Sequence, residues 1–282
     1  MMRDLSGKTA VVLGASAEGG TGWAIAEALA QAGANVVVGA RSLGPLQTLA
    51  DRIGGLAVHC DAGSEEDISA LSDAAAQKYG RIDIAVNSAA TPTLSMIRDV
   101  TPELMQQAVS TNLFGMTYFV KHMARNMPDG GAMVLISSMS ATHPIEPHFA
   151  YAAAKAGMEC MIKYAAREFS DQKIRVNGIR IATVYSDMAK SHYDSPGITE
   201  RFVHEIPAGR LGVPADMADT VLWLSGNDYI TGSVLDIAGG NQINRFPFLH
   251  ELPGAGASYE GAGALADREQ GKGFDAGTLN KA

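Results

Sequence analysis

The sequence has few cysteines, no long apolar run and no basic excess. Of its 282 residues only Cys60 and Cys160 are cysteines, and their spacing is not one that metal ligands use. We interpret both as reduced thiols in buried elements of a cytoplasmic protein, and we expect no metal site. No stretch reaches the roughly 18 apolar residues of a membrane span, and the first residues do not resemble a signal peptide.

The charge balance is acidic. The chain has 22 basic and 30 acidic residues, a formal net charge of −8. This argues against nucleic acid or an anionic membrane as the main partner. The hydrophobic content of 46% is enough for a substantial core, and no internal repeat or linker divides it. We therefore expect one α/β domain that acts on a small molecule.

A strand, a glycine-rich turn and a helix follow one another near the start. Residues 9–13 are apolar and partly β-branched, residues 14–22 are rich in glycine, and residues 23–30 are typical of a helix. Gly14, Gly20 and Gly22 would let a ligand approach the backbone, and the helix N-terminus presents unpaired N–H groups. This succession predicts a pyrophosphate site.

The ends of the next two expected strands indicate which dinucleotide binds. The strand at residues 35–39 leads into Arg41, where an acidic residue would bind a ribose 2′-hydroxyl and an arginine suits a 2′-phosphate. NADP(H) is therefore favoured, although a surface arginine at a helix start would leave NAD(H) open. The strand at residues 56–60 is followed by Asp61, which we expect to contact the adenine.

Two polar amides stand at informative positions. Asn87 follows the expected strand at residues 82–86, where a cofactor would lie. Asn112 lies within a long helix expected from Thr101 to about Met127, with Thr101 as the cap and Pro102 in the first turn. A mid-helix asparagine is unfavourable unless its amide has a partner.

The stretch from Ser138 to Lys155 is the candidate catalytic centre. Ser138 follows the apolar strand at residues 133–136, so it stands at the edge where ligands bind in parallel sheets. Tyr151 and Lys155 are four residues apart in a helix expected from Phe149 to Phe169, and would share one face. An isolated pair would also fit a half-buried tyrosine and a solvated lysine. Ser138 and the glycine-rich turn favour a shared site.

These residue types suit proton transfer at an oxygen atom. A phenol with an ordinary pKa of about 10 needs a shift of roughly 2–3 units to exchange protons near pH 7 to 8. We expect the Lys155 ammonium to supply much of that shift by favouring the phenolate. The Ser138 hydroxyl would donate to the developing alkoxide, and a cofactor must supply the hydride.

The rest of the chain contains a predicted lid and a tail of different composition. Residues 182–209 read as an irregular segment that includes Val184 and Ser186, and a long loop beyond a strand end is often a lid. A helix at 216–224, a strand at 234–237 and a turn at Gly239 and Gly240 follow. We place the domain at residues 1–245 and a Gly- and Ala-rich extension at residues 246–282, which would wrap a partner or stay disordered.

Together, the N-terminal glycine loop, Asn112, Ser138, Tyr151 and Lys155 resemble the short-chain dehydrogenases/reductases over roughly Leu5 to Asn244. The segments Ile206 to Pro214 and Tyr229 to Gly240 resemble the C-terminal signature of that family. The resemblance implies a three-layer, doubly wound parallel sheet of Rossmann-like type, a nicotinamide cofactor and a homotetramer, or a homodimer.

The resemblance also implies roles for these residues. Tyr151 would be the acid/base, Lys155 would bind the nicotinamide ribose and lower the tyrosine pKa, Ser138 would orient the carbonyl, and Asn112 would hold a water in a proton relay. The resulting catalytic set is Asn112, Ser138, Tyr151 and Lys155. The cofactor set is Gly14, Ser16, Gly20, Gly22, Arg41, Asp61, Asn87, Tyr151, Lys155, Val184 and Ser186.

Several positions depart from the family pattern. The usual Gly-x-x-x-Gly-x-Gly spacing is longer here, because the glycines stand at Gly14, Gly20 and Gly22. This longer loop is similar to the branch that contains enoyl-acyl-carrier reductases. In that branch the catalytic tyrosine precedes the lysine by seven residues, at the position of His148 here. Tyr151 therefore favours ketone and secondary-alcohol chemistry.

Two rival functions remain. One is reduction of the C=C bond of an enoyl thioester on the same fold. The other is a nicotinamide-binding sensor or scaffold without chemistry, which would not need the four catalytic residues together. The substrate cannot be read from the residues, but Met139, His143, Pro144 and Ile145 suggest a partly apolar pocket for a cyclic or aromatic ketone or alcohol.

Overall fold

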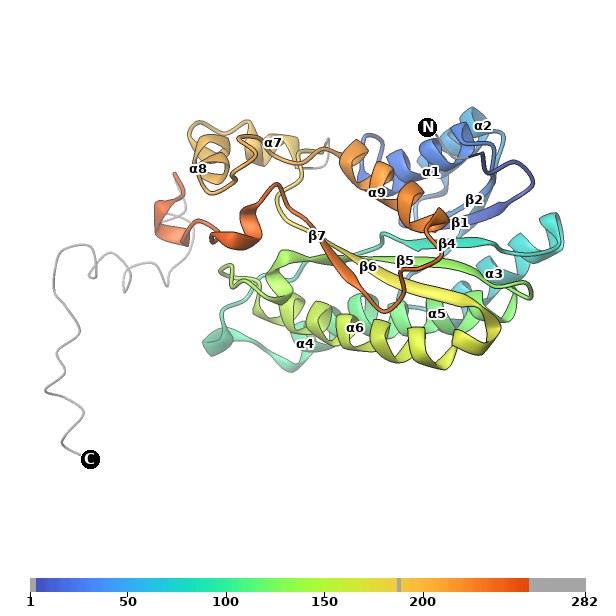
Figure 1. The fold of residues 1–282 in the computed structure, drawn as a ribbon. Helices are drawn as coiled ribbons and strands as arrows, with labels where there is room; N and C mark the ends of the chain where they lie inside the picture. Colours follow the sequence, from blue (N-terminus) through green and yellow to red (C-terminus); the bar gives the residue numbers. More distant parts are fainter. Residues whose placement is uncertain (1–3, 187–188, 254–282) are drawn as a thin grey trace, which may run out of the picture.

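A single parallel sheet lies between two layers of helices in this computed structural model, which describes residues 4–186 and 189–253 (Figure 1). Within these residues the sheet has seven strands in the order β3-β2-β1-β4-β5-β6-β7, and every neighbouring pair is parallel. The strands are β1 (Thr9–Leu13), β2 (Asn35–Ala40), β3 (Leu56–His59), β4 (Ile84–Asn87), β5 (Gly131–Ser138), β6 (Ile174–Ile181) and β7 (Val234–Ile237). The predicted Rossmann-like α/β fold is confirmed.

Helices connect the strands and cover both faces of the sheet. They are α1 (Thr21–Gln31), α2 (Leu43–Ile53), α3 (Glu65–Tyr79), α4 (Pro102–Val109), α5 (Met116–Arg125), α6 (Phe149–Glu168), α7 (Lys190–Tyr193), α8 (Ile198–His204) and α9 (Pro214–Gly226). The predicted Thr101 cap is present, and Ser64 caps α3 in the same way. The Ser64 hydroxyl accepts from the N–H of Asp67 at 3.2 Å, and the Thr101 hydroxyl accepts from the N–H of Leu104 at 3.3 Å.

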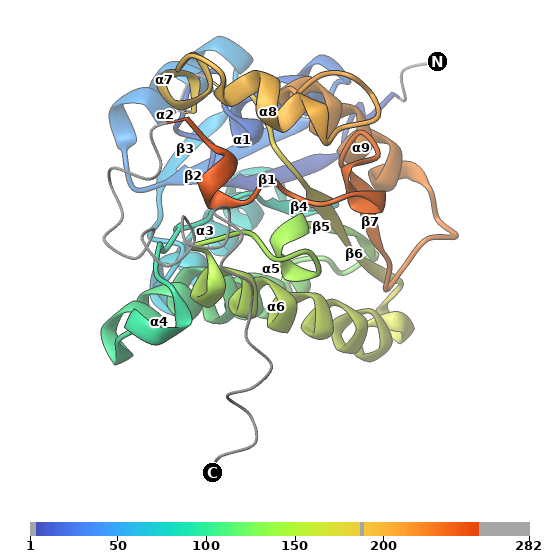
Figure 2. The same ribbon diagram turned by 90° about the vertical axis from the view of Figure 1, so that its left-hand side faces the viewer.

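Alternate residues of each strand point to opposite faces of the sheet and pack into two separate hydrophobic cores. Helices α1, α2 and α9 cover one face, and α3, α5 and α6 cover the other (Figures 1 and 2). Along β1, Val12 packs into the first core and Val11 into the second. Because both faces are covered, β1 and the middle of β5 are mostly apolar, as buried parallel sheets require, whereas β6 and β7 also carry Arg180 and Asp236.

The strand order changes direction between β1 and β4, since β2 and β3 continue on one side and β5 to β7 on the other. Such a switch point opens a crevice at the carboxyl ends of the strands. The glycine loop after β1, Asn87 at the end of β4 and Ser138 at the end of β5 all reach this edge. The topology therefore places the predicted site residues together.

The structure corrects three expectations. The helix from Thr101 to Met127 is not continuous, because a π-helical segment (Ser110–Gly115) separates α4 from α5. The segment at residues 182–209 is not wholly irregular, since it contains α7 and α8. Cys160 is not a core thiol: it is exposed on α6, whereas Cys60 is buried, and the helix turns its side chain away from the sheet.

Within the described part of the chain, no helix has both the length and the apolar character needed to cross a membrane. The division of the chain at residues 245 and 246 stays a prediction. Most of the predicted extension, from residue 254 onward, lies outside the described residues. Its first residues are described, and Phe246 is buried against the domain.

Candidate active site

Ser138 ends β5 and begins a short 3₁₀ turn (Met139–Ala141) at the carboxyl edge of the sheet. Its hydroxyl oxygen accepts hydrogen bonds from the backbone N–H of Ser140 at 3.2 Å and from the Ser140 hydroxyl at 2.9 Å. A further hydrogen bond joins Ser138 to the phenol of Tyr151. The turn thus orients the Ser138 hydroxyl toward Tyr151, as the sequence predicts.

Tyr151 and Lys155 occupy successive turns of α6; Lys155 is fully buried, and Tyr151 is partly buried. The Lys155 Nζ lies 5.7 Å from the centre of the Tyr151 ring. It donates a 2.7 Å hydrogen bond to the carbonyl of Ile136 in β5. Lys155 is therefore fixed against the sheet, with its ammonium end beside the tyrosine, and the solvated lysine considered above is excluded.

The acid–base properties of this pair differ from expectation. Burial raises the pKa of Tyr151 to about 12, and the hydrogen bond from Ser138 opposes this only in part. Burial also lowers the pKa of Lys155 to about 7. The expected lowering of the Tyr151 pKa by a Lys155 ammonium is therefore wrong for the protein alone, because desolvation disfavours both the phenolate and the ammonium.

A buried carboxylate lies one further turn along α6. Glu159 accepts from the Ser137 hydroxyl at 2.6 Å and pairs with Arg180 of β6 at 2.7 Å, and Arg180 in turn contacts Asp236 of β7 at 2.6 Å. The Glu159 charge opposes the lowering of the Lys155 pKa. Sequence reasoning missed Glu159, although its i, i+4 spacing from Lys155 was the available signal.

Asn112 lies in the π-helical segment and is fully buried. Its amide nitrogen donates to the carbonyls of Thr91 and Ala108, each at 2.9 Å, and its amide oxygen accepts from the N–H of Thr91 at 3.3 Å. The hydrogen-bond partner that the Asn112 amide needs is thus the backbone of Thr91, in the loop after β4. The role of Asn112 in holding a water stays a prediction.

The glycine loop brings three backbone segments into close contact. Gly14 has φ +90°, a conformation that favours glycine. A side-chain carbon at Gly14 would overlap the backbone of Ala89, and one at Gly22 would overlap the carbonyl of Gly14. Gly20 caps α1 in an extended conformation. The N-terminus of α1 therefore opens on a surface of bare backbone, as phosphate binding requires.

A groove of about 420 Å³ runs along the switch point from this loop to Tyr151. Of the predicted cofactor residues, Gly14, Ser16, Arg41, Asp61 and Tyr151 line it. Asp61 is also engaged locally, since its carboxylate accepts from the N–H of Gly63 at 2.8 Å. The predicted residues from four separate parts of the chain therefore share one surface.

The other predicted cofactor residues lie outside that lining or behind it. Gly20 and Gly22 shape the loop and Lys155 lies beneath Tyr151. Asn87 is buried at the end of β4; its amide oxygen accepts from the N–H of Ala89 at 3.0 Å, but its amide nitrogen has no partner. Val184 pairs with Gly212, and Ser186 follows two residues later. The structure does not bring these last two into the groove.

A second cavity, of about 720 Å³, meets the groove at Tyr151. Ser138, His148 and Tyr151 lie on one side of it, and Tyr193 and Phe202 come from the α7–α8 segment. Met188, within the segment expected to be a lid, lies outside the described residues. The walls are mainly apolar, which suits an organic substrate.

Sequence reasoning missed the part of this cavity that comes from the C-terminal segment. Phe246, Leu249, Leu252 and Pro253 line it. The signal was the apolar run that begins at Phe246, which the predicted boundary at residue 245 assigned to the extension. His148 also lines the cavity: its ring lies edge-on to Tyr151, with 6.5 Å between centroids, and its buried Nδ1 has no hydrogen-bond partner among the described residues. Burial lowers the pKa of His148.

Comparison with known proteins finds similarity over most of the chain. A family model described as enoyl-(acyl carrier protein) reductase matches residues 14–242. The 7alpha-hydroxysteroid dehydrogenase of Escherichia coli (strain K12) is 33% identical over 245 residues, which cover 84% of this chain and 94% of that protein. The D-threitol dehydrogenase of Mycolicibacterium smegmatis is 32% identical over 248 residues, covering 85% and 94%.

The same similarity appears among solved structures. A 7 alpha-hydroxysteroid dehydrogenase complexed with NADH and 7-oxo glycochenodeoxycholic acid superposes with a TM-score of 0.79 and 31% identity, covering 88% of this chain and 97% of that one. The family match at residues 14–242 includes the glycine loop, Asn112, Ser138, Tyr151 and Lys155.

Proposed function

This chain belongs to the short-chain dehydrogenase/reductase family, and from this premise we propose that it interconverts a ketone and a secondary alcohol with a nicotinamide cofactor. The observation that carries the proposal is the position of the Tyr151 hydroxyl. It is hydrogen-bonded to Ser138 where the groove at the switch point meets the second cavity. A proton donor there faces both a cofactor site and a substrate site.

The residues of the groove fit a nicotinamide dinucleotide. Gly14 and Gly22 leave room for a pyrophosphate at the N-terminus of α1. The unpartnered amide nitrogen of Asn87 is a buried donor that a bound group could satisfy. Arg41 and Asp61 line the end of the groove where the adenosine would lie. When bound, the nicotinamide supplies or accepts the hydride.

The residues around Tyr151 move and hold the proton. With a pKa of about 12, Tyr151 carries its proton at neutral pH and is ready to donate it to a carbonyl oxygen. The Ser138 hydroxyl stabilises the charge that develops on that oxygen. Lys155, fixed by Ile136, stabilises the phenolate that remains. A protonated resting tyrosine is the form that can donate a proton to a ketone.

NADP(H) is the preferred cofactor in this proposal. Arg41 lies at the carboxyl end of β2, in the lining of the groove, and its side chain is exposed. A guanidinium there can pair with a 2′-phosphate. The related structure that holds NADH shows that its own site accepts the unphosphorylated cofactor, so NAD(H) is the alternative that the binding test below decides.

The substrate is a bulky, apolar ketone or secondary alcohol. A cavity of about 720 Å³ falls within the usual 300–1,000 Å³ of small-molecule sites. Its polar groups gather near Tyr151, while Ile198, Phe202 and Phe246 form an apolar wall. The names of the relatives, which range from a hydroxysteroid to a threitol enzyme, do not narrow the choice, so the cavity supports this part of the proposal.

The assembly is a homotetramer or a homodimer that packs through the long helices. Phe114, in the π-helical segment, and Phe149 and Tyr164, on α6, are large apolar side chains with exposed fractions of 42%, 39% and 66%. Exposed large apolar side chains on one helical layer support a protein interface.

The variant Tyr151→Phe tests the proposal. It removes the proton donor and keeps the ring, so kcat for ketone reduction should fall at least ~100-fold, as loss of general acid catalysis predicts. Cofactor affinity should stay within about twofold of wild type. Tyr164→Phe, an exposed position on the same helix, is the matched control and should leave kcat unchanged. Full activity of Tyr151→Phe would refute the assignment.

A further inference from the structure

The last described residues turn back over the substrate cavity instead of leaving the domain. After β7 the chain forms two 3₁₀ turns (Asn241–Ile243 and Leu249–Glu251), and the second lies beside α8 (Figures 1 and 2). We name residues 244–253 the C-terminal strap. It packs on the same side of the site as the α7–α8 segment.

One side of the strap is apolar and faces the cavity. Phe246 is only 6% exposed and belongs to a small core that includes Ile198 and Phe202 of α8. Leu249, Leu252 and Pro253 extend this surface along the cavity. The strap and α8 therefore form one continuous apolar wall opposite the catalytic residues on α6.

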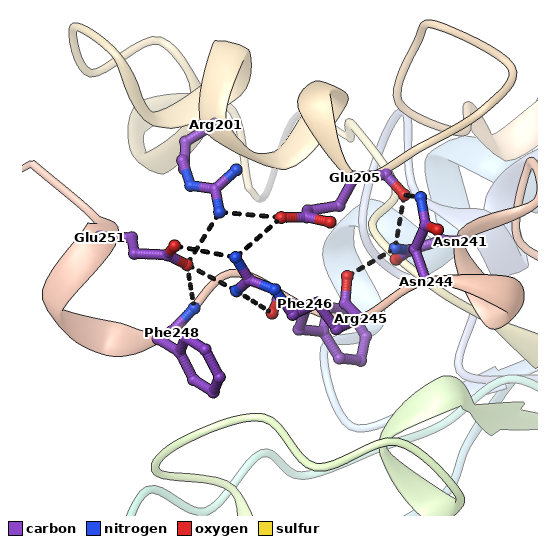
Figure 3. Close-up of polar contacts among 8 residues, drawn as sticks. All are labelled: Arg201, Glu205, Asn241, Asn244, Arg245, Phe246, Phe248 and Glu251. Carbon is purple, nitrogen blue, oxygen red and sulfur yellow. Dashed lines mark hydrogen bonds and ion pairs between the residues drawn. The ribbon is translucent and has the colours of Figure 1, made fainter.

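The other side of the strap holds four charged groups in a closed ring (Figure 3). Arg245 and Glu251 form a bidentate pair at 2.6 and 2.8 Å. Arg245 also contacts Glu205 at 3.1 Å. Arg201 contacts both carboxylates, Glu205 and Glu251, at 2.8 Å each. Arg201 lies on α8 and Glu205 directly after it, whereas Arg245 and Glu251 belong to the strap. The ring therefore joins the two segments.

Other contacts fix the same ring. Asn241 and Asn244 donate to the backbone carbonyl of Glu205 at 3.0 and 3.1 Å. The Arg245 guanidinium lies 4.4 Å from the centre of the Phe248 ring. Hydrogen bonding to Arg245 holds the pKa of Glu251 well below its usual range, so Glu251 is ionised at neutral pH.

A ring of this kind couples the positions of the segments that it joins. An exposed single ion pair contributes little, but a partly buried, bidentate network with shared partners contributes more. The side chains of Arg201 and Glu205 are 19% and 11% exposed. None of the four charged residues is among the described residues that line the cavity. Their effect on a substrate must therefore act through the wall.

From this geometry we propose that Arg201, Glu205, Arg245 and Glu251 form a clamp that holds the strap and α8 together as a rigid wall, and so determines selectivity for large apolar ketones. The four are positioning residues and do not contact the substrate. A small ketone needs only Ser138 and Tyr151, whereas a large one also packs on Phe202, Phe246 and Leu249. The substrate part of this inference rests on the proposed ketone reduction.

The first arm of the test measures the clamp directly. Hydrogen–deuterium exchange of the full chain should become at least ~10-fold faster in peptides from both the strap and α8 when Arg245→Gln breaks the ring. Arg245→Lys keeps the charge but loses the bidentate geometry, and should give an intermediate result. Arg52→Gln, which breaks the Arg52–Glu27 pair elsewhere, is the control and should change neither segment. Faster exchange in the strap alone would overturn the shared clamp.

The second arm measures selectivity with 2-decalone and acetone. Arg245→Gln should raise KM for 2-decalone about 10-fold with little change in kcat, and should leave KM for acetone and the affinity for NADPH unchanged. The double variant Arg245→Gln/Glu251→Gln should cost no more than the single one, because both break the same ring. An equal rise in KM for both ketones would contradict the inference. If the wild type reduces neither ketone, the proposed substrate class fails, and the exchange arm still decides the clamp.

Discussion

Replacing Arg41 by glutamine should remove most of the preference for NADPH over NADH. Among the described residues Arg41 has no ion-pair partner, so it gives up no internal interaction when it meets a ligand phosphate. A hydrogen bond between charged groups contributes ~1.5–3 kcal/mol. Because Arg41 is exposed at the end of the groove, solvent and salt reduce this free-energy contribution toward its lower limit of ~1.5 kcal/mol. That value corresponds to a change of roughly tenfold in Kd.

Titration of the protein with NADPH and NADH, followed by nicotinamide fluorescence, measures this preference. NADPH should bind about tenfold more weakly to Arg41→Gln than to wild type, while NADH should bind equally to both. The NADPH preference of the wild type should also shrink as salt increases. Arg52→Gln, on the following helix, is a charge-matched control. Equal loss of both cofactors, or tighter NADH binding by the wild type, would refute the role of Arg41.

Two further predictions concern the loop and the buried lysine. Gly14→Ala should lower Tm and weaken binding of both cofactors at least ~10-fold, because the new methyl group meets the backbone of Ala89. The control Gly44→Ala, where the structure leaves open space, should leave stability unchanged or raise it. Unchanged cofactor binding by Gly14→Ala would contradict the description of the loop. Burying the Lys155 charge lowers the stability of the fold fully at pH values below the folded pKa of about 7, and this loss disappears as pH rises toward the unfolded pKa near 10.4. The Tm of wild type should therefore rise relative to that of Lys155→Met between pH 7 and pH 10. A constant Tm difference in thermal scans over that range would show that the Lys155 pKa is not lowered.

The sheet and the positions of Ser138, Tyr151 and Lys155 were predictable because local patterns decide them. Short apolar runs bounded by turns located β1 to β5 and β7. The four-residue spacing of Tyr151 and Lys155 on α6 placed both on one face, and Ser138 at the end of β5 brought it to the same edge. These features depend on backbone periodicity and on the rule that parallel strands share one carboxyl edge.

The misjudged features depend on tertiary contacts. The exposure of Cys160 follows from which face of α6 meets the sheet. In the π-helical segment, Asn112 donates a hydrogen bond to the carbonyl of Thr91 in the loop after β4. The hydrophobic period of a helix does not predict such a contact. The pKa of Tyr151 follows from burial on several sides. Phe246 and Leu249 line the cavity because this segment packs against α8, which is distant in sequence.

The most direct test of the central claim is the fate of the transferred hydride. Wild-type protein is incubated with NADPH that carries deuterium at the C4 position transferred as hydride, with 2-decalone and with an enoyl thioester in parallel, and the products are analysed by NMR. The account predicts deuterium on the carbinol carbon of the secondary alcohol formed from the ketone, and none in the thioester. Deuterium in the β-carbon of a saturated thioester, with the ketone unchanged, would contradict it.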